Sequence, residues 1–159
     1  MSVYRRFDTE GYPSLVTTNA ANRRPVFHSD AAAALLIEII YEVRRETAFP
    51  LLAFVVMPDH IHLVLSPSSV DSLAKIMQLV KGRFARRYHS ESGERGSLWQ
   101  SRYHERALRA ERELLEAIDY VHRNPVSAGL ATAPQDYPWS SAGGRFSVDL
   151  TSYLGQAEA

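Results

Sequence analysis

Two hydrophobic spacings alternate along the chain and predict a protein that mixes strands with helices. Runs of β-branched or continuous apolar residues predict strands at residues 13–19, 51–57, 60–65 and 98–108. Apolar residues three or four positions apart predict helices at residues 31–47, at 70–89 and from 111 onward. The predicted order of elements is therefore β-α-β-β-α-β-α.

Residue types at the ends of these segments support the division. Asp30 occupies the expected N-cap position of the first helix, and Pro50 closes that helix. Pro58 and Asp59 form a short turn, so the second and third strands should pair as a hairpin. Pro125 interrupts the third helix.

The order of elements favours an α+β fold. It predicts a four-stranded, mainly antiparallel sheet with helices packed mainly on one face, as in the ferredoxin-like sandwich. The 159 residues fit one domain, and the chain has no internal repeat. We therefore expect residues 1–159 to form a single domain, with residues 131–159 as a C-terminal tail that Tyr137 and Trp139 anchor to the core.

Composition excludes several classes of protein. Apolar residues make up 45% of the chain and charged residues 23%, as in ordinary globular proteins. The absence of cysteine excludes a disulfide framework, thiolate metal sites and cysteine nucleophiles. The N-terminus lacks the apolar run of a secretory signal, and no segment reaches the roughly 18 apolar residues that span a bilayer. We expect a soluble cytoplasmic protein.

Charge is balanced overall but unevenly distributed. The 18 basic and 18 acidic residues cancel, which by itself argues against nucleic-acid binding. Basic residues nevertheless gather in and after the second predicted helix: Lys75, Lys81, Arg83, Arg86, Arg87, Arg102, Arg106 and Arg109. Two interpretations remain open, a basic face that binds a polyanion and a set of separate solvated helix faces.

A His-x-His pattern on the third strand is the first candidate for chemistry. Side chains at positions i and i+2 of a strand point to the same face, so His60 and His62 should leave the sheet together. Two neighbouring imidazoles can ligate one divalent metal, although further ligands must come from elsewhere. Six histidines in this chain give about 0.2 such patterns by chance, so the position between apolar strand residues supports the metal site more than the triplet does.

The third helix carries the second candidate. Tyr120 falls at the edge of the apolar stripe, and Asn124 lies one turn later on the same side. The tyrosine hydroxyl and the carboxamide could thus reach a common point. Spacing alone favours a different interpretation, in which Tyr120 is a boundary aromatic that covers the core. Asn124, which precedes Pro125, would then be the N-cap of the following turn.

Other catalytic patterns are missing from the sequence. It contains no phosphate-binding P-loop, no dinucleotide-binding glycine motif, no zinc-protease helix and no serine nucleophile elbow. The pair of H-x-[ST] motifs typical of two-histidine phosphodiesterases is also missing. The remaining histidines are isolated, and we expect each to be a surface or packing residue: His28, His89, His104 and His122.

Four segments in this order and spacing resemble the single-tyrosine HUH transposases. They are VVMPDHIHLVL (55–65), LWQSRYHE (98–105), YVHRNPVSAGL (120–130) and YPWSSA (137–142). The chain is most similar to the REP-associated tyrosine transposases, relatives of insertion-sequence enzymes that act on bacterial palindromic repeats. Asp59 departs from the family pattern, in which Asn is common after Met-Pro, and an acid beside the histidines could tune them.

The resemblance implies specific roles. His60 and His62 match the two histidines of the HUH motif, Tyr120 matches the nucleophile, and Asn124 matches a third metal-facing residue. The metal would be Mg²⁺ or Mn²⁺, and the substrate single-stranded DNA beside a hairpin. The implied reaction is cleavage and strand transfer through a 5′-phosphotyrosine intermediate. Candidate DNA contacts are Lys81, Arg83, Arg86, Arg87, Trp99, Arg102, Tyr103 and Arg106.

Two alternatives remain at this point. The same fold without chemistry could bind single-stranded nucleic acid through aromatic residues on the sheet, although strand 60–65 carries histidines where such aromatics are expected. A metal-dependent nuclease could instead use water and form no bond to DNA. Relatives exist as dimers with shared active sites and as monomers, so the sequence leaves a monomer and a homodimer open. A membrane partner is not expected.

Overall fold

A four-stranded antiparallel sheet forms the centre of the computed structural model, which describes residues 11–68 and 70–158. The strands are β1 (Ser14–Asn19), β2 (Leu51–Met57), β3 (His60–Leu65) and β4 (His104–Ala107). Their spatial order is β2-β3-β1-β4, and every neighbouring pair is antiparallel. The predicted α+β class and the predicted order of strands and long helices are confirmed.

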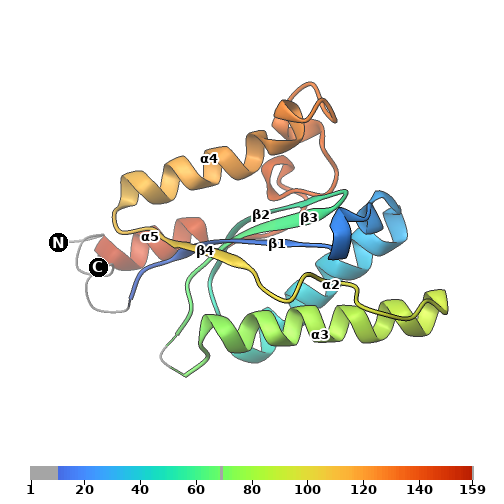
Figure 1. The fold of residues 1–159 in the computed structure, drawn as a ribbon. Coiled ribbons are helices and arrows are strands. Elements are labelled where there is room, and N and C mark those ends of the chain that lie inside the picture. The colour runs from blue at the N-terminus through green and yellow to red at the C-terminus, as the bar shows by residue number, and fades with distance from the viewer. Residues whose placement is uncertain (1–10, 69, 159) are drawn as a thin grey trace.

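Helices cover both faces of this sheet (Figure 1). Helices α2 (Asp30–Thr47) and α3 (Leu73–Ser92) lie side by side on one face, whereas α4 (Glu111–Ser127) crosses the other. The prediction of helices mainly on one face therefore holds for α2 and α3 but not for α4. The sequence pattern also missed α5 (Leu150–Glu158) and the short 3₁₀ turns η1 (Ala21–Arg23), η2 (Val26–His28), η3 (Pro134–Asp136) and η4 (Ser141–Gly143).

The burial of β2 explains why α4 takes the opposite face. All seven residues of this strand are buried, so both of its faces need an apolar cover. Phe54 and Val56 belong to the core that α2 and α3 complete. Val55 and Met57 belong to a second core, which α4 completes. The position of β2 between two helical layers therefore explains its continuous apolar run.

Local sequence signals differ from the structure at two element ends. Ser29 caps α2, because its side-chain oxygen accepts a hydrogen bond from the backbone of Ala32, and Asp30 is the first helical residue. Pro125 lies inside α4, which continues to Ser127. Asn124 is therefore a helical residue whose carbonyl accepts from the Ala128 amide, not the N-cap of a following turn.

The fourth strand is shorter than predicted. β4 contains four residues, all exposed, in place of the predicted residues 98–108. The preceding segment pairs with the sheet region through an isolated bridge between Ala20 and Trp99. Because exposed residues show no apolar alternation, the sequence pattern could not define the bounds of this strand.

The C-terminal segment closes the outer edge of β2. The amide of Val56 donates to the carbonyl of Trp139 over 2.8 Å, and the amide of Phe54 donates to Oγ of Ser141 over 3.0 Å. The hydroxyl of Tyr137 donates to the carbonyl of Val56 over 2.7 Å. The predicted anchors Tyr137 and Trp139 are confirmed. Among the described residues, no helix combines the length and the apolarity needed to cross a membrane.

Candidate active site

The two histidines of β3 lie on one face of the sheet, as their spacing predicted. Their ring centroids are 4.8 Å apart, and the rings meet edge to face. Val64, two residues further along the same face, packs in the core beneath α4. The imidazoles of His60 and His62 therefore belong to the α4 side of the sheet, at the end of the hairpin formed by β2 and β3.

A separate neighbour holds each imidazole through its Nδ1 atom. His62 Nδ1 shares a hydrogen bond of 2.8 Å with Oγ1 of Thr17, its register partner on β1. His60 Nδ1 lies 2.7 Å from Oδ1 of Asp59, and Nε of Arg23 donates to Oδ2 of the same carboxylate over 3.0 Å. These contacts leave the Nε2 atoms as the ring positions open to a ligand.

Burial keeps His62 neutral. Its side chain is only 5% exposed. Burial first, and then the nearby charges of His60 and Arg23, lower the pKa of His62 to about 4. Burial alone would raise the pKa of Asp59, but hydrogen bonds from His60 and Arg23 outweigh it and hold that pKa below its ordinary value. The site thus pairs a neutral imidazole with an ionised carboxylate near pH 7.

Helix α4 brings Tyr120 beside this pair. The Tyr120 ring lies 5.5 Å from the His62 ring, centroid to centroid, in an edge-to-face arrangement. Its side chain is 52% exposed, so solvent and a large substrate can reach the phenol. The structure therefore brings Tyr120 close to His60 and His62, which precede it by about 60 positions in the sequence.

His60 and His62 need a further ligand to hold a divalent metal. That ligand must be a side chain other than an acid or a third histidine. Among residues 11–68 and 70–158, no three His, Cys, Asp or Glu side chains gather as metal ligands would. Asn124 is half-buried one turn after Tyr120 on α4. Its carboxamide oxygen is a ligand of the kind that Mg²⁺ and Mn²⁺ accept, together with neutral imidazoles.

His122 lies away from this cluster. Its Nε2 shares a hydrogen bond of 2.8 Å with Oγ of Ser141, which also accepts from the amide of Phe54. Burial lowers the pKa of His122. The side chain therefore ties α4 to the C-terminal segment, which confirms the expected packing role.

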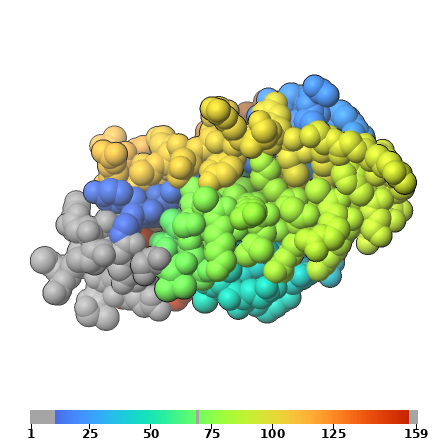
Figure 2. Space-filling view, turned by 60° about the horizontal axis from the view of Figure 1, so that its bottom comes forward, coloured from blue at the N-terminus to red at the C-terminus, as the bar shows by residue number. Residues whose placement is uncertain are grey.

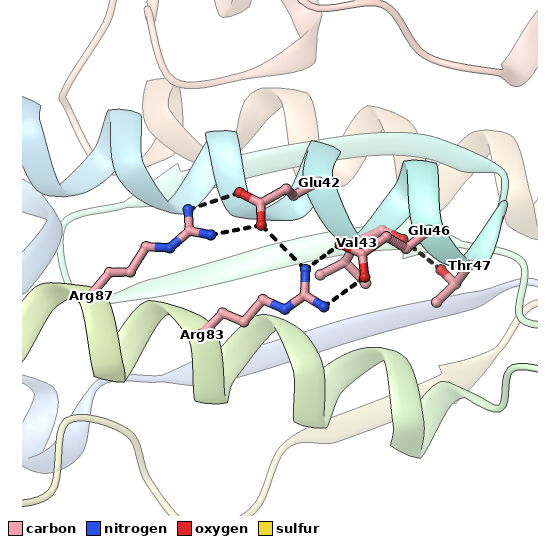
Figure 3. A network of polar contacts seen from close by, with 6 residues as sticks. All are labelled: Glu42, Val43, Glu46, Thr47, Arg83 and Arg87. Carbon is pink, nitrogen blue, oxygen red and sulfur yellow. Dashed lines mark hydrogen bonds and ion pairs between the residues drawn. The ribbon is translucent and has the colours of Figure 1, made fainter.

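Two arginines predicted to contact DNA are engaged within the fold. Both carboxylate oxygens of Glu42 accept hydrogen bonds from Arg87, at 2.7 and 2.8 Å. Arg83 binds both Glu42 and Glu46 (Figure 3). These cations of α3 are neutralised by α2, because the two helices pack side by side. Arg86, in contrast, is exposed.

Trp99, a candidate DNA contact, is buried instead. This side chain is 8% exposed, packs against Phe27 and Phe84, and donates its indole N–H to the carbonyl of Lys81. Trp99 is therefore a core residue. The Nζ atom of Lys81 binds the carbonyl of Gln100 over 2.9 Å, so this cation is also partly engaged.

The other candidates on this segment remain accessible. Arg102 and Arg106 are exposed, and Tyr103 is half-buried. Sequence reasoning missed Thr17 and Arg23, both of which contact the site. Neither carries a local motif, since Thr17 reaches His62 through strand register and Arg23 reaches Asp59 from a loop.

The family model described as "Transposase IS200 like" matches residues 14–124, a range that includes every residue of this cluster. The chain belongs to the IS200-like transposase family. It is 29% identical over 142 residues to the REP-associated tyrosine transposase of Escherichia coli (strain K12). The matched region covers 89% of this chain and 82% of the relative.

A solved structure agrees with this family assignment. The fold matches that of a REP-associated tyrosine transposase bound to a REP hairpin, with a TM-score of 0.73 and 28% identity. The match covers 97% of this transposase-family chain and 88% of the other. The resemblance to REP-associated tyrosine transposases is thus confirmed, together with the antiparallel α+β fold.

Proposed function

We propose that this chain is a metal-dependent single-stranded DNA endonuclease and strand transferase. It would act on hairpin-forming repeat DNA through a 5′-phosphotyrosine intermediate. The contact between the Tyr120 and His62 rings carries the proposal, because it sets a reachable phenol beside a neutral imidazole that itself neighbours His60. The hairpin bound by the relative of known structure supports the choice of substrate.

His60, His62 and Asn124 are the residues that would hold Mg²⁺ or Mn²⁺. Both imidazoles have their Nδ1 atoms occupied by neighbours, so their Nε2 lone pairs suit a metal. When bound, the divalent ion would polarise the scissile phosphate and offset its developing negative charge. The half-buried position of Asn124 one turn from Tyr120 fits a third ligand supplied by α4.

Tyr120 would supply the nucleophile. Its oxygen attacks phosphorus, a new bond between the tyrosine oxygen and phosphorus forms, and the bond from phosphorus to the 3′ oxygen breaks. The phenol gives up its proton, the leaving 3′ oxygen gains one, and the 5′-phosphate stays on the enzyme. Attack by another 3′-hydroxyl reverses the step, so the intermediate permits joining to a second strand.

The DNA strand would lie beside the cluster, on the α4 side of β1 and β4. α4 packs over β2 and β3, so the α4 side of β1 and β4 has less helical cover. Register places His104 opposite Thr17 and Arg106 opposite Leu15, on the same face as His62. Figure 2 shows that α3 and the segment leading to β4 form one continuous surface. Exposed Arg86, Arg102 and Arg106, together with Lys81 and Tyr103, would contact the DNA.

Replacing Tyr120 by Phe tests the proposal directly. The variant keeps the ring and its contact with His62 but removes the hydroxyl, so cleavage of a hairpin oligonucleotide with a single-stranded flank should be lost. DNA binding and thermal stability should stay close to wild type. The wild-type protein should form a denaturant-resistant adduct with the 3′ fragment, whose 5′-phosphate it retains. The measurement is gel mobility of labelled DNA, with Tyr12→Phe, at an exposed tyrosine that precedes β1, as the control.

Three outcomes would contradict parts of the proposal. Cleavage by Tyr120→Phe at the wild-type rate would remove the nucleophile. Efficient wild-type cleavage without any adduct would favour a nuclease that uses water. Binding without cleavage under all metal conditions would favour a nucleic-acid-binding module without chemistry.

A further inference from the structure

We propose that Arg23 and Asp59 form a positioning pair for His60, which fixes the proton on Nδ1 and directs the Nε2 lone pair into the site. This inference rests on the proposed metal site and adds two residues to it. The sequence pointed to Asp59 as an acid beside the histidines, but it did not point to Arg23 as the partner of that acid.

The carboxylate of Asp59 uses both oxygens. Oδ1 accepts from Nδ1 of His60 over 2.7 Å, and Oδ2 accepts from Nε of Arg23 over 3.0 Å. An ionised carboxylate can only accept hydrogen bonds, so Nδ1 of His60 must carry the proton. A neutral imidazole has one such proton, and its Nε2 atom is therefore the free donor atom for a ligand.

The loop that carries Arg23 is built onto the turn that carries Asp59. Asn22 and Arg23 have φ angles of 57° and 54°, a left-handed conformation that residues other than glycine rarely adopt. Backbone hydrogen bonds connect the Ala20 amide to the Asp59 carbonyl and the Phe27 amide to the Pro58 carbonyl, both at 2.9 Å. The fold thus maintains a strained loop that holds the Arg23 side chain against Asp59.

An asparagine at position 59 could perform only part of this role. Its carboxamide offers one acceptor oxygen, which could still receive Nδ1–H of His60. Its other atom is an N–H donor and would face the Nε–H donor of Arg23. The link to Arg23 would therefore be lost, and the remaining acceptor would carry no charge.

Thr17 holds His62 in a less specific way. A hydroxyl can donate or accept, so the contact between Oγ1 of Thr17 and Nδ1 of His62 is compatible with either position of the ring proton. The carboxylate beside His60 is compatible with only one. Of the two histidines, His60 is therefore the one whose proton position is set by its neighbour.

Nitrogen NMR of metal-free protein labelled with ¹⁵N-histidine tests the pair. At pH 7.5 the wild type should show His60 with the proton on Nδ1. Asp59→Ala should shift His60 toward the form with the proton on Nε2, Asp59→Asn should give an intermediate shift, and Arg23→Gln a smaller one. Arg24→Gln is the matched control, because Arg24 is the next residue and its ion pair joins Glu94 instead.

Calorimetric titration with Mn²⁺ gives the second readout. Affinity should fall about 10- to 100-fold in Asp59→Ala, as for other outer-shell partners of a metal-binding histidine, and stay unchanged in Arg24→Gln. Thermal melting checks that each variant is folded. If Asp59→Ala does not fold, Asp59→Asn, which keeps an acceptor, is titrated with Mn²⁺ in its place.

The two proposals fail in different ways. An unchanged His60 proton position in both folded Asp59 variants would overturn the positioning pair, while loss of the DNA adduct in Tyr120→Phe would still support the proposed function. The NMR measurement is made on metal-free protein, so its result does not depend on metal binding. A protein that binds no Mn²⁺ would contradict the proposed metal site but leave an Asp59-dependent proton position as support for the pair.

Discussion

At the scale of single residues, His62 differs from an ordinary histidine in how it responds to acid. Its pKa of about 4 in the folded protein compares with 6.5 for an unperturbed histidine. Between these two values the unfolded chain binds a proton that the folded protein excludes. The stability contributed by a neutral His62 is therefore full above pH 6.5 and is lost as the pH falls toward 4.

We expect this loss to be measurable by urea unfolding at pH 7.0 and 4.5. The His62 contribution to the free energy of unfolding should fall by up to about 3 kcal/mol, because each unit of pKa difference corresponds to about 1.4 kcal/mol. His62→Gln has no proton to bind in this range, so its stability should depend less on pH than that of the wild type. Identical pH dependence in the two proteins would show that the burial of His62 does not control its protonation.

The sequence predicted the residues of the site better than their arrangement. The two-residue period of a strand was enough to place His60 and His62 on one face. The contact between His62 and Tyr120 could not be derived, since it depends on how α4 crosses the sheet, and the family resemblance alone pointed to it. Arg23 was missed because its position depends on a left-handed loop with no glycine to mark it.

At the scale of secondary-structure elements, the pairing of α2 with α3 decides which cations are available to DNA. Glu42 and Glu46 neutralise Arg83 and Arg87, so only part of the basic stretch seen in the sequence faces solvent as free charge. Apolar periodicity predicted both helices but not their contact, because ion pairs between helices depend on packing. The basic surface is thus narrower than the sequence indicated.

Charge reversal on the two helices should therefore have unequal effects. Arg86→Glu on α3 should weaken binding to a hairpin oligonucleotide, whereas Arg45→Glu, an exposed arginine near the end of α2, should change it little. The slope of log affinity against log salt should also become less steep in Arg86→Glu, since one phosphate contact fewer releases fewer counterions. Fluorescence anisotropy at several salt concentrations measures both quantities. Equal losses in the two variants would mean that the DNA surface lies elsewhere.

At the scale of the whole molecule, the C-terminal segment contributes to the same cores as the sheet. Tyr137 and Tyr153 are buried in the core beneath α4, and Asp149 pairs with Arg44 of α2 and with the amide of Leu51. We propose that residues 1–159 form one domain, in which residues 131–159 are a structural part rather than an appendage. Such a domain should unfold in a single transition.

Removing one hydroxyl from this segment tests its contribution. Tyr137→Phe deletes the hydrogen bond to the carbonyl of Val56 and leaves that buried acceptor without it, so the free energy of unfolding should fall by about 1–3 kcal/mol. Tyr12→Phe, at an exposed tyrosine, should cost much less. Urea unfolding followed by circular dichroism gives both values, and equal stability of the two variants would refute the structural role of the segment.

The closure of β2 by the C-terminal segment has a consequence for the newborn chain. Tyr137 lies 81 positions after its partner Val56, so a ribosome must add all of these residues before this edge can be covered. Until then the most apolar strand of the sheet presents unpaired amides and carbonyls to its surroundings. A message that stops before the codon for Tyr137 would therefore release a product prone to associate with other nascent chains. Translation speed between the codons for Val56 and Tyr137 would affect the yield of folded protein.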